Sequence, residues 1–254
     1  MADKDIFLTV VLPNYNEEEN LKRGVLDQVY TYLSQQNYSF EIIVSDDGST
    51  DNSPKIVQQF AQTHPQLHLL KNSHAGKPFA LRSAINQAKG RFVLLTDMDQ
   101  STPIEEIEKL LPWVDKGYKV IIGSRGKFRK DAPLYRKLAS VIFQLARRSI
   151  LLPEIIDTQC GFKLIETQLA RKIFSKMLLF QRDSQAKGWK VTAYDVEMLH
   201  LARKLGESIK EVPVVWQDED VSSGKSRNFI KESYEMLLEI LRVRYNDLRG
   251  RYAL

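Results

Sequence analysis

Apolar residues in the first half of the chain fall into short runs, and each run ends in polar or acidic residues. Runs of this length, rich in Val, Ile, Leu and Phe, are typical of strands buried on both faces of a parallel sheet. The predicted strands are 6–12, 40–45, 67–71, 92–96 and 120–124. Between them the spacing predicts helices that open at 17–20 and cover 54–63, 78–88 and 103–114. This alternation predicts an α/β fold with a doubly wound, mostly parallel sheet flanked by helices.

The pattern changes after Ser124. Apolar residues recur at helical spacing over 133–152, with arginines and lysines around them, which predicts a basic amphipathic helix. Its apolar side either lies at a membrane interface or packs on the core. Two helices and one strand are predicted further on, at 195–205, 229–245 and 209–216. Pro213 places that strand at an edge of the sheet. No repeat or linker divides the chain, so we expect a single domain over 1–254.

Composition limits the class of protein. Hydrophobic residues make up 43% and charged residues 27% of the 254 positions, which is typical of a globular protein. The one cysteine, Cys160, excludes an internal disulfide and suits a reducing compartment. No apolar stretch approaches the ~18 residues that cross a bilayer, and the N-terminus lacks the pattern of a signal peptide. We therefore expect a cytoplasmic protein that rests on a membrane surface without crossing it.

Positive charge is concentrated in one segment. The net charge is +5, and the stretch from Gly123 to Arg148 carries many basic residues against Asp131 alone. Such a segment indicates an anionic partner, either phosphate, nucleic acid or an acidic membrane, unless it is a solvated basic helix. Nucleic acid is disfavoured because the chain has no basic surface interleaved with aromatic residues for base stacking.

Two carboxylates follow the predicted strand at 92–96. Asp97 and Asp99 stand at its carboxyl end, where open α/β sheets bind their ligands. Carboxylate oxygens in this position suit Mg²⁺ or Mn²⁺ shared with substrate phosphates. Two such acids taken alone are also common in a solvated loop. The predicted metal site therefore depends on the other motifs as well.

Four segments together resemble one family. They are VVLPNYNEEENL at 10–21, EIIVSDDGSTDNS at 41–53, FVLLTDMDQSTP at 92–103 and DTQCGFKL at 157–164. In this order they are similar to the family 2 inverting glycosyltransferases, which have the GT-A fold. DTQCGFK, with YDVEML at 194–199 and EVPVVW at 211–216, further resembles the branch that glucosylates dolichyl or polyprenyl phosphate. The resemblance implies a nucleotide-sugar-binding half at 1–124 and an acceptor-binding half at 125–254.

The resemblance also implies a donor site at the ends of the first strands. The positions that it carries over for donor binding are Pro13, Tyr15, Glu17, Asp47, Lys77 and Asp97. It assigns Asp97 and Asp99 as ligands of Mg²⁺ or Mn²⁺, with Asp99 favoured for direct coordination. Many relatives read DADG where this chain has Met98 and Gln100. Turn or packing roles are the alternatives for Pro13 and Tyr15, and helix capping for Asp47. Lys225 either reaches the diphosphate from a closing loop or lies in a surface loop.

An acceptor site is implied by the basic segment and by the segment DTQCGFKL at 157–164. A phosphate monoester has its second pKa at ~6, so it needs to be held more than deprotonated. Arg125 and Arg129 are expected to grip it, because guanidinium groups bind phosphate oxygens in two places. Asp157 is either a base or an orienting carboxylate, and a phosphate acceptor favours the second role. Gln159 and Asp195 are expected to line the sugar and acceptor pocket.

We therefore expect a metal-dependent transferase that moves glucose from UDP-glucose to a polyprenyl phosphate of the dolichyl type. Its expected partners are the nucleotide sugar, the lipid phosphate and the cytoplasmic face of an anionic membrane, with no nucleic acid. The alternatives are GDP-mannose as donor, a hydroxyl acceptor with Asp157 as its base, and a non-catalytic protein that binds the membrane surface.

Overall fold

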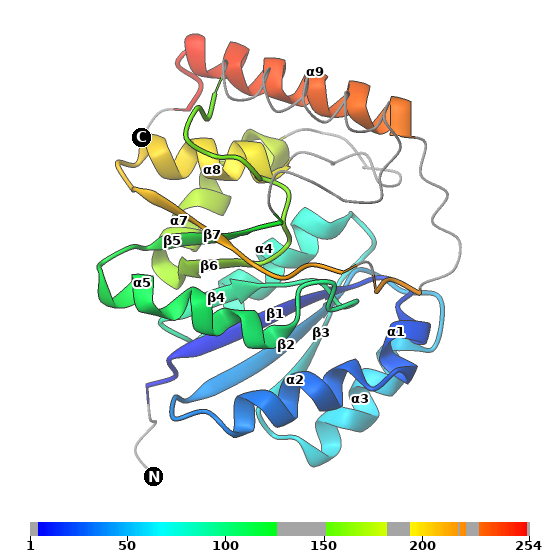
Figure 1. Ribbon diagram of the computed structural model, residues 1–254. Helices are drawn as coiled ribbons and strands as arrows, with labels where there is room; N and C mark the ends of the chain where they lie inside the picture. Colours follow the sequence, from blue (N-terminus) through cyan, green and yellow to red (C-terminus); the bar gives the residue numbers. More distant parts are fainter. Residues whose placement is uncertain (1–4, 126–150, 182–193, 218, 222–228, 253–254) are drawn as a thin grey trace.

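A seven-stranded sheet runs through the centre of the protein (Figure 1). The computed structural model describes residues 5–125, 151–181, 194–217, 219–221 and 229–252, with only the backbone over 229–236. The strands are β1 Leu8–Asn14, β2 Phe40–Asp46, β3 Leu67–Lys71, β4 Phe92–Leu95, β5 Val120–Ser124, β6 Lys163–Glu166 and β7 Ile209–Pro213. Their order is β3-β2-β1-β4-β6-β5-β7. β6 pairs antiparallel with β4 and β5, and the other pairings of this sheet are parallel.

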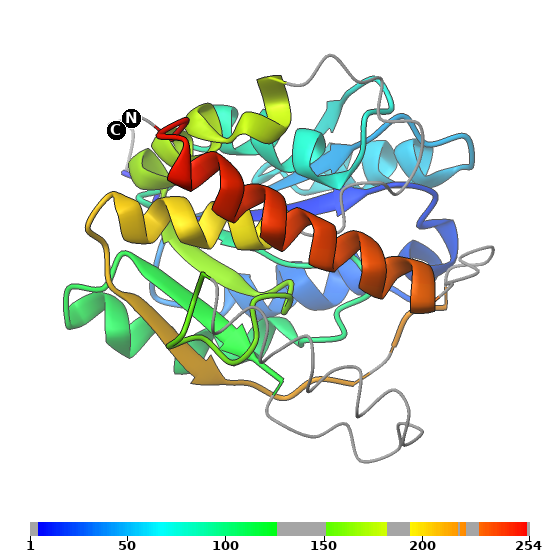
Figure 2. The same ribbon diagram turned by 90° about the horizontal axis from the view of Figure 1, so that it is seen from above.

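Helices cover both faces of the sheet (Figures 1 and 2). One face carries α1 Glu18–Lys22, α2 Val25–Ser34, α3 Ser53–Thr63, the 3₁₀ helix η1 Ile104–Lys109 and α5 Leu111–Asp115. The other carries α4 Lys77–Gln87, α7 Thr167–Lys176, the 3₁₀ helix η2 Leu178–Gln181, α8 Tyr194–Lys204 and α9 Phe229–Leu248. The two layers give the molecule a hydrophobic core on each side of the sheet.

The alternation of side chains along the strands builds these two cores. In β4, Phe92 and Leu94 enter the core under α2, whereas Val93 and Leu95 enter the core under α4. All four are at most 2% exposed. Successive residues of a strand point to opposite faces, so a continuous apolar run is what a strand covered on both sides requires.

The last helix packs as an outer layer on α8 (Figure 2). Ile240 and Val243 of α9 are buried in the core. An ion pair of 2.6 Å joins Lys204 of α8 to Asp247 of α9. Tyr252, just beyond α9, donates a 2.9 Å hydrogen bond to Glu197 of α8. No helix in the described part of the chain is long and apolar enough to cross a membrane.

The predicted fold class is confirmed, and the edge position predicted for β7 is confirmed as well. Three elements were missed, since no strand or helix was predicted at β6, α7 and η2. The helix predicted over 103–114 is wrong in its continuity, because Pro112 has no backbone N–H to continue an α-helix and the segment divides into η1 and α5. Likewise Gly24, at φ 80°, separates α1 from α2. The basic helix predicted over 133–152 lies outside the described residues except at 151 and 152.

Candidate active site

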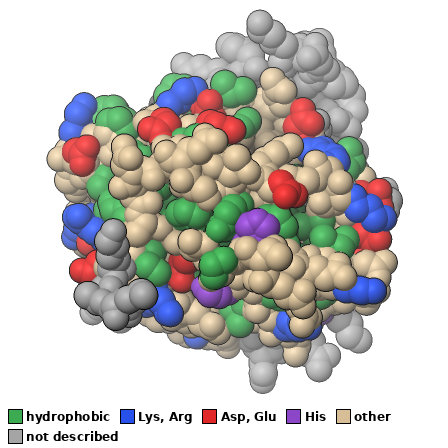
Figure 3. Space-filling view, turned by 90° about the horizontal axis from the view of Figure 1, so that it is seen from below, with side chains coloured by type: hydrophobic (Ala, Val, Ile, Leu, Met, Phe, Trp, Pro, Cys, Tyr) green, Lys and Arg blue, Asp and Glu red, His purple; other side chains and the backbone are tan. Residues whose placement is uncertain are grey.

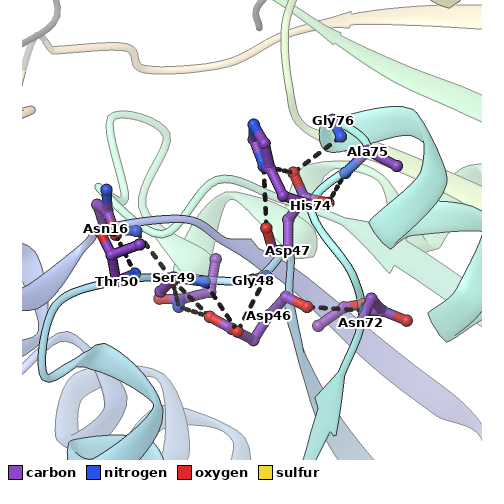
Figure 4. Close-up of polar contacts among 12 residues, drawn as sticks. Asn16, Asp46, Asp47, Gly48, Ser49, Thr50, Asn72, His74, Ala75 and Gly76 are labelled. Atoms are coloured by element: carbon purple, nitrogen blue, oxygen red, sulfur yellow. Dashed lines mark hydrogen bonds and ion pairs between the residues drawn. The ribbon is translucent and has the colours of Figure 1, made fainter. Parts of the chain in front are cut away.

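The loops after β1 and β2 are joined by a network of polar side chains (Figure 4). The Asn14 amide donates to Asp46 at 2.7 Å and to Ser49 at 3.1 Å. Asn16, at φ 53°, accepts a 2.8 Å hydrogen bond from the N–H of Thr50 through its own amide oxygen. An asparagine tolerates this left-handed backbone better than most residues, because its short side chain bonds locally. The network holds the carboxyl ends of the two strands together.

Asp47 organises the segment that leads into α4 (Figure 4). Its carboxylate is 4% exposed and accepts hydrogen bonds from the N–H groups of Ala75 at 2.9 Å and Gly76 at 2.8 Å. Gly48 comes next, at φ 74°, and a Cβ there would lie 2.9 Å from the backbone nitrogen of His74. Both the backbone conformation and the close approach therefore require glycine.

His74 lies between Asp47 and Tyr15, and no role was predicted for it from the sequence. Its Nδ1 is 3.0 Å from the Asp47 carbonyl oxygen and 2.9 Å from Oδ2 of the same residue. Both partners are acceptors, so Nδ1 carries a proton, and Nε2 is an acceptor whenever the ring is neutral. The His74 ring stacks on Tyr15 with centroids 4.3 Å apart and planes at 19°. The two rings form a flat aromatic surface beside the loops of β1 and β2.

Lys77 and Asp97, two predicted donor-site residues, are in direct contact. Lys77 begins α4 and its Nζ forms an ion pair with Oδ1 of Asp97, which follows β4. Burial alone would lower the pKa of Lys77, but the carboxylate of Asp97 raises it above its usual range. Gly161 of the segment DTQCGFKL packs against the same carboxylate, because a Cβ there would fall 2.1 Å from Oδ2 of Asp97. Asp97 thus contacts both the lysine that begins α4 and a glycine of that segment.

Asp99 stands two residues further on in a tight loop. Burial, followed by the negative charge of Asp97, raises the pKa of Asp99 above its usual range. Gln100 adopts φ 51°, the left-handed region that a glycine would occupy at lower cost. Its side-chain amide donates a 2.8 Å hydrogen bond to the Asp97 carbonyl and supports this turn. Met98 is 2% exposed and fills the core. These contacts show how Met98 and Gln100 are accommodated in this loop.

The donor atoms at the end of β4 suit a hard divalent cation. Asp97 and Asp99 offer carboxylate oxygens, the ligand type that Mg²⁺ and Mn²⁺ prefer. Among the described residues there is no group of three or more His, Cys, Asp or Glu side chains that could hold a metal ion. Two carboxylates are nevertheless the usual protein contribution where substrate phosphates and water complete the coordination. The residues present therefore fit a metal that is shared with a diphosphate.

Arg125 and Asp157 form a buried two-pronged ion pair across the sheet end. Nε of Arg125 donates to Oδ2 at 2.7 Å and its NH2 donates to Oδ1 at 2.9 Å. Burial alone would raise the pKa of Asp157, but the hydrogen bonds and charge of Arg125 outweigh it and lower the pKa to about 2. The carboxylate of Glu211 also holds this loop, because it accepts hydrogen bonds from the N–H groups of Ile156 at 2.8 Å and Asp157 at 2.7 Å.

Lys163 and Asp195 form a second buried ion pair, and this contact was not predicted from the sequence. Lys163 of β6 is 1% exposed, and its Nζ lies 2.6 Å from Oδ1 of Asp195 on α8. The charges of Asp195 and Asp97 both act on Lys77, which links the two ion pairs into one cluster. The sequence did contain a signal for this ion pair. Lys163 stands next to apolar residues, and a buried ammonium group needs an acidic partner.

The remaining predicted residues have different surroundings. Pro13 lies in β1 directly before the Asn14 network. Glu17 accepts a 2.6 Å hydrogen bond from Asn20 at the start of α1. The N–H of Gln159 donates to Asp157 at 3.0 Å. Arg129 and Lys225 lie outside the described residues, so their predicted roles stay predictions, as do the donor and acceptor contacts predicted for the other residues.

Comparisons with known proteins agree on one family. The model of glycosyl transferase family 2 matches residues 9–174. A dolichyl-phosphate beta-glucosyltransferase of Dictyostelium discoideum is 31% identical, over 97% of this chain and 76% of its own length. The human protein of the same description is 30% identical over 83% of this chain and 67% of its own length.

Solved structures share the fold. A mannosyl-3-phosphoglycerate synthase from Rubrobacter xylanophilus superposes with a TM-score of 0.65 at 16% identity, covering 97% of this chain and 76% of that one. A glucosyl-3-phosphoglycerate synthase from Mycobacterium tuberculosis, solved with Mn²⁺ and UDP-glucose, gives 0.59 at 17% identity, covering 94% and 79%. At these identities the likeness concerns the fold, which is the GT-A fold of glycosyltransferases.

Proposed function

The chain belongs to glycosyl transferase family 2, and we propose that it transfers glucose from UDP-glucose to a polyprenyl phosphate with inversion at the anomeric carbon. The observation that carries the proposal is the alignment of nearly the whole chain with dolichyl-phosphate beta-glucosyltransferases. The Arg125–Asp157 pair supports it from the structure, because it presents a fixed guanidinium group at the strand ends. We propose that the half at 1–124 binds the donor and the half at 125–254 binds the acceptor.

The nucleotide binds at the loops after β1 and β2 in this proposal. The stacked rings of Tyr15 and His74 offer a flat surface to the base. Nε2 of His74, an acceptor in the neutral ring, suits the N3–H donor of uracil. Asp47 acts mainly by shaping this surface, since its carboxylate holds His74 and the N–H groups of Ala75 and Gly76.

The diphosphate lies over the end of β4 and the start of α4. Asp97 and Asp99 would hold Mg²⁺ or Mn²⁺, which when bound supplies Lewis-acid stabilisation of the departing diphosphate. Lys77 contributes positive charge at the same place, from the first residue of a helix whose N-terminus favours anions. Lys225 adds to this charge when its loop closes.

The acceptor phosphate is held by Arg125 and Arg129. One phosphate oxygen attacks the anomeric carbon from the side opposite the UDP group; the new C–O bond forms as the bond to UDP breaks. An acceptor that is already largely dianionic needs no general base. Asp157 fits this chemistry, because a carboxylate with a pKa of about 2 is a poor proton acceptor at neutral pH. Its role is to fix the guanidinium group of Arg125, while Gln159 and Asp195 border the sugar.

We place the enzyme at the cytoplasmic surface of an anionic membrane, where its lipid acceptor resides. The basic stretch from Gly123 to Arg148 supports this position.

Release of nucleoside diphosphate tests the proposal. Purified protein is incubated with Mg²⁺ or Mn²⁺ and a panel of UDP- and GDP-sugars, with and without a short polyprenyl phosphate. We expect release from UDP-glucose that depends on the lipid phosphate. Equal release without the lipid would indicate a hydroxyl acceptor or water, release from GDP-mannose alone would replace the donor, and no release with any donor would support a non-catalytic role.

A further inference from the structure

The outward side of α9 carries a continuous row of apolar side chains. Leu237, Leu241, Tyr245 and Leu248 recur at intervals of three or four residues, the spacing of one helix face. Their exposed fractions are 37%, 47%, 49% and 71%. Leu238, 40% exposed, widens the row. In contrast, Ile240 and Val243 point to the opposite side and are buried on α8. The helix is therefore apolar on two sides, of which the core covers only one.

Arginines border this apolar row on both sides. At 100° per residue, Arg242 lies on one side of Leu241 and Arg244 on the other. Both side chains are about half exposed, at 46% and 45%, and each forms an ion pair within α9, Arg242 with Glu239 and Arg244 with Asp247 at 3.5 Å. Arg249, just beyond the helix, lies over the Tyr245 ring at 4.9 Å. The two acids of residues 237–251, Glu239 and Asp247, are only 18% and 16% exposed. The exposed surface of this described part of α9 thus combines apolar and positively charged groups.

We propose that this face of α9, defined by Leu237, Leu238, Leu241, Tyr245 and Leu248 with their flanking arginines, binds the surface of an anionic membrane. A helix of this kind lies in the interface plane, with leucines among the acyl chains and arginines at the headgroups. Tyr245 suits the same boundary, since its ring is apolar and its hydroxyl polar. The inference rests on the proposed function in one respect, namely that the acceptor is a lipid.

The charge pattern favours a membrane over a second copy of the chain. Two copies that paired through this face would bring the arginines of one against those of the other, and like charges at an interface oppose association. An anionic lipid surface attracts every one of them. The face of the molecule opposite α9 differs, because acidic and basic side chains are mixed around its rim (Figure 3).

α9 forms the outermost layer on its side of the sheet (Figures 1 and 2). Its first turns lie on the side of the molecule at which β1 ends, where the candidate active site lies. The apolar row begins at Leu237, beyond these turns, and runs to Leu248 at the other end of the helix. A membrane on this row would therefore lie along the outer side of α9, and a lipid phosphate would reach the site past the first turns of the helix.

Flotation with vesicles tests the surface. The full chain is mixed with phosphatidylcholine vesicles, with or without phosphatidylglycerol, at low and high salt. We expect binding to the anionic vesicles that weakens as salt rises. Leu241→Glu with Leu248→Glu should lower the partition coefficient on the order of a hundredfold, because burying each leucine contributes roughly tenfold or more. Arg242→Ala with Arg244→Ala should lower it roughly thirtyfold, at about fivefold for each basic residue.

Val215→Glu is the matched control, since Val215 is 46% exposed but lies after β7 and not on α9. It should leave flotation unchanged. A change of less than about threefold in the leucine double variant, smaller than one leucine should give, would overturn the proposal. Light scattering that shows a dimer in the parent chain and a monomer in the leucine variant would overturn it too.

Diphosphate release with a water-soluble, short-chain polyprenyl phosphate separates this inference from the proposed function. Without vesicles, the parent chain and the leucine double variant should release UDP equally. If release fails while flotation behaves as expected, the surface stands and the proposed activity is wrong. If release occurs and flotation does not depend on the α9 face, the activity stands and the surface assignment is wrong.

Discussion

Asp157→Asn should destabilise the protein, and the size of the effect can be worked out from the pKa of Asp157. The Asp157 side chain is 9% exposed and receives two hydrogen bonds from the guanidinium group of Arg125. Asparagine keeps the shape of the side chain but removes its charge, so the partly buried Arg125 loses this counter-charge. The variant therefore isolates the electrostatic part of the contact.

The size of the effect follows from the pKa of Asp157. Its shift from the ordinary 3.8 to about 2 means that the fold favours the ionised form. At about 1.36 kcal/mol per pKa unit, the shift corresponds to roughly 2 kcal/mol of stability. Because the folded pKa is the lower one, this stability is fully present above pH 3.8 and is lost as the pH falls through about 2. The difference between parent and variant should therefore be constant from pH 5 to pH 8.

Urea denaturation at pH 5, 7 and 8 measures this difference. The control is Asp115→Asn, a change at an exposed position at the end of α5, which should cost at most about 0.5 kcal/mol. A cost for Asp157→Asn below about 0.5 kcal/mol at pH 7 would show that the pair is not formed. A cost that changes between pH 5 and pH 8 would show that Asp157 titrates there, and would restore its candidacy as a general base.

Three further predictions concern the site. In a plot of kcat/KM against pH, the fall in activity on the acidic side should reflect protonation of the acceptor phosphate, whose second pKa is ~6. With a phosphonate acceptor this fall should move to higher pH. If it stays in place, the titrating group belongs to the enzyme. Lys163→Met should cost about 3–5 kcal/mol by stranding the carboxylate of Asp195, and adding Asp195→Leu should recover part of that cost in urea denaturation; strictly additive costs would contradict the pairing. Gly48→Ala should cost more stability than Gly117→Ala, since both have positive φ but only the first places a Cβ within 2.9 Å of His74; equal costs in urea denaturation would contradict the close approach.

The strands of the first half could be predicted because burial on both faces leaves a direct mark on the sequence. Phe92 to Leu95 are all apolar, and the acids that follow mark the end of the strand. β6 left no comparable mark, since it begins with a lysine and ends with a glutamate. Its antiparallel direction comes from its place between β4 and β5, which is a tertiary property. The breaks at Gly24 and Pro112 follow from local chemistry and could have been anticipated.

The candidate site could be predicted residue by residue, but its pairings could not. Arg125 and Asp157 were both expected near the acceptor, yet 32 positions separate them and only the folded sheet brings them into contact. The pairing adds support for the orienting role that was favoured for Asp157, because the low pKa argues against a base. His74 was missed since a histidine in a loop has no distinctive pattern, and its role depends on Tyr15 and Asp47 from two other loops.

Transfer of glucose to a lipid phosphate with inversion can be tested on the structure of the product. UDP-glucose labelled in the sugar is incubated with a short polyprenyl phosphate and Mg²⁺, and the organic phase is analysed by mass spectrometry and NMR. We expect a glucosyl phosphate lipid in which the sugar is β-linked, and no such product from a variant with Arg125→Met. Label that stays in the aqueous phase, or an α-linked product, would contradict it.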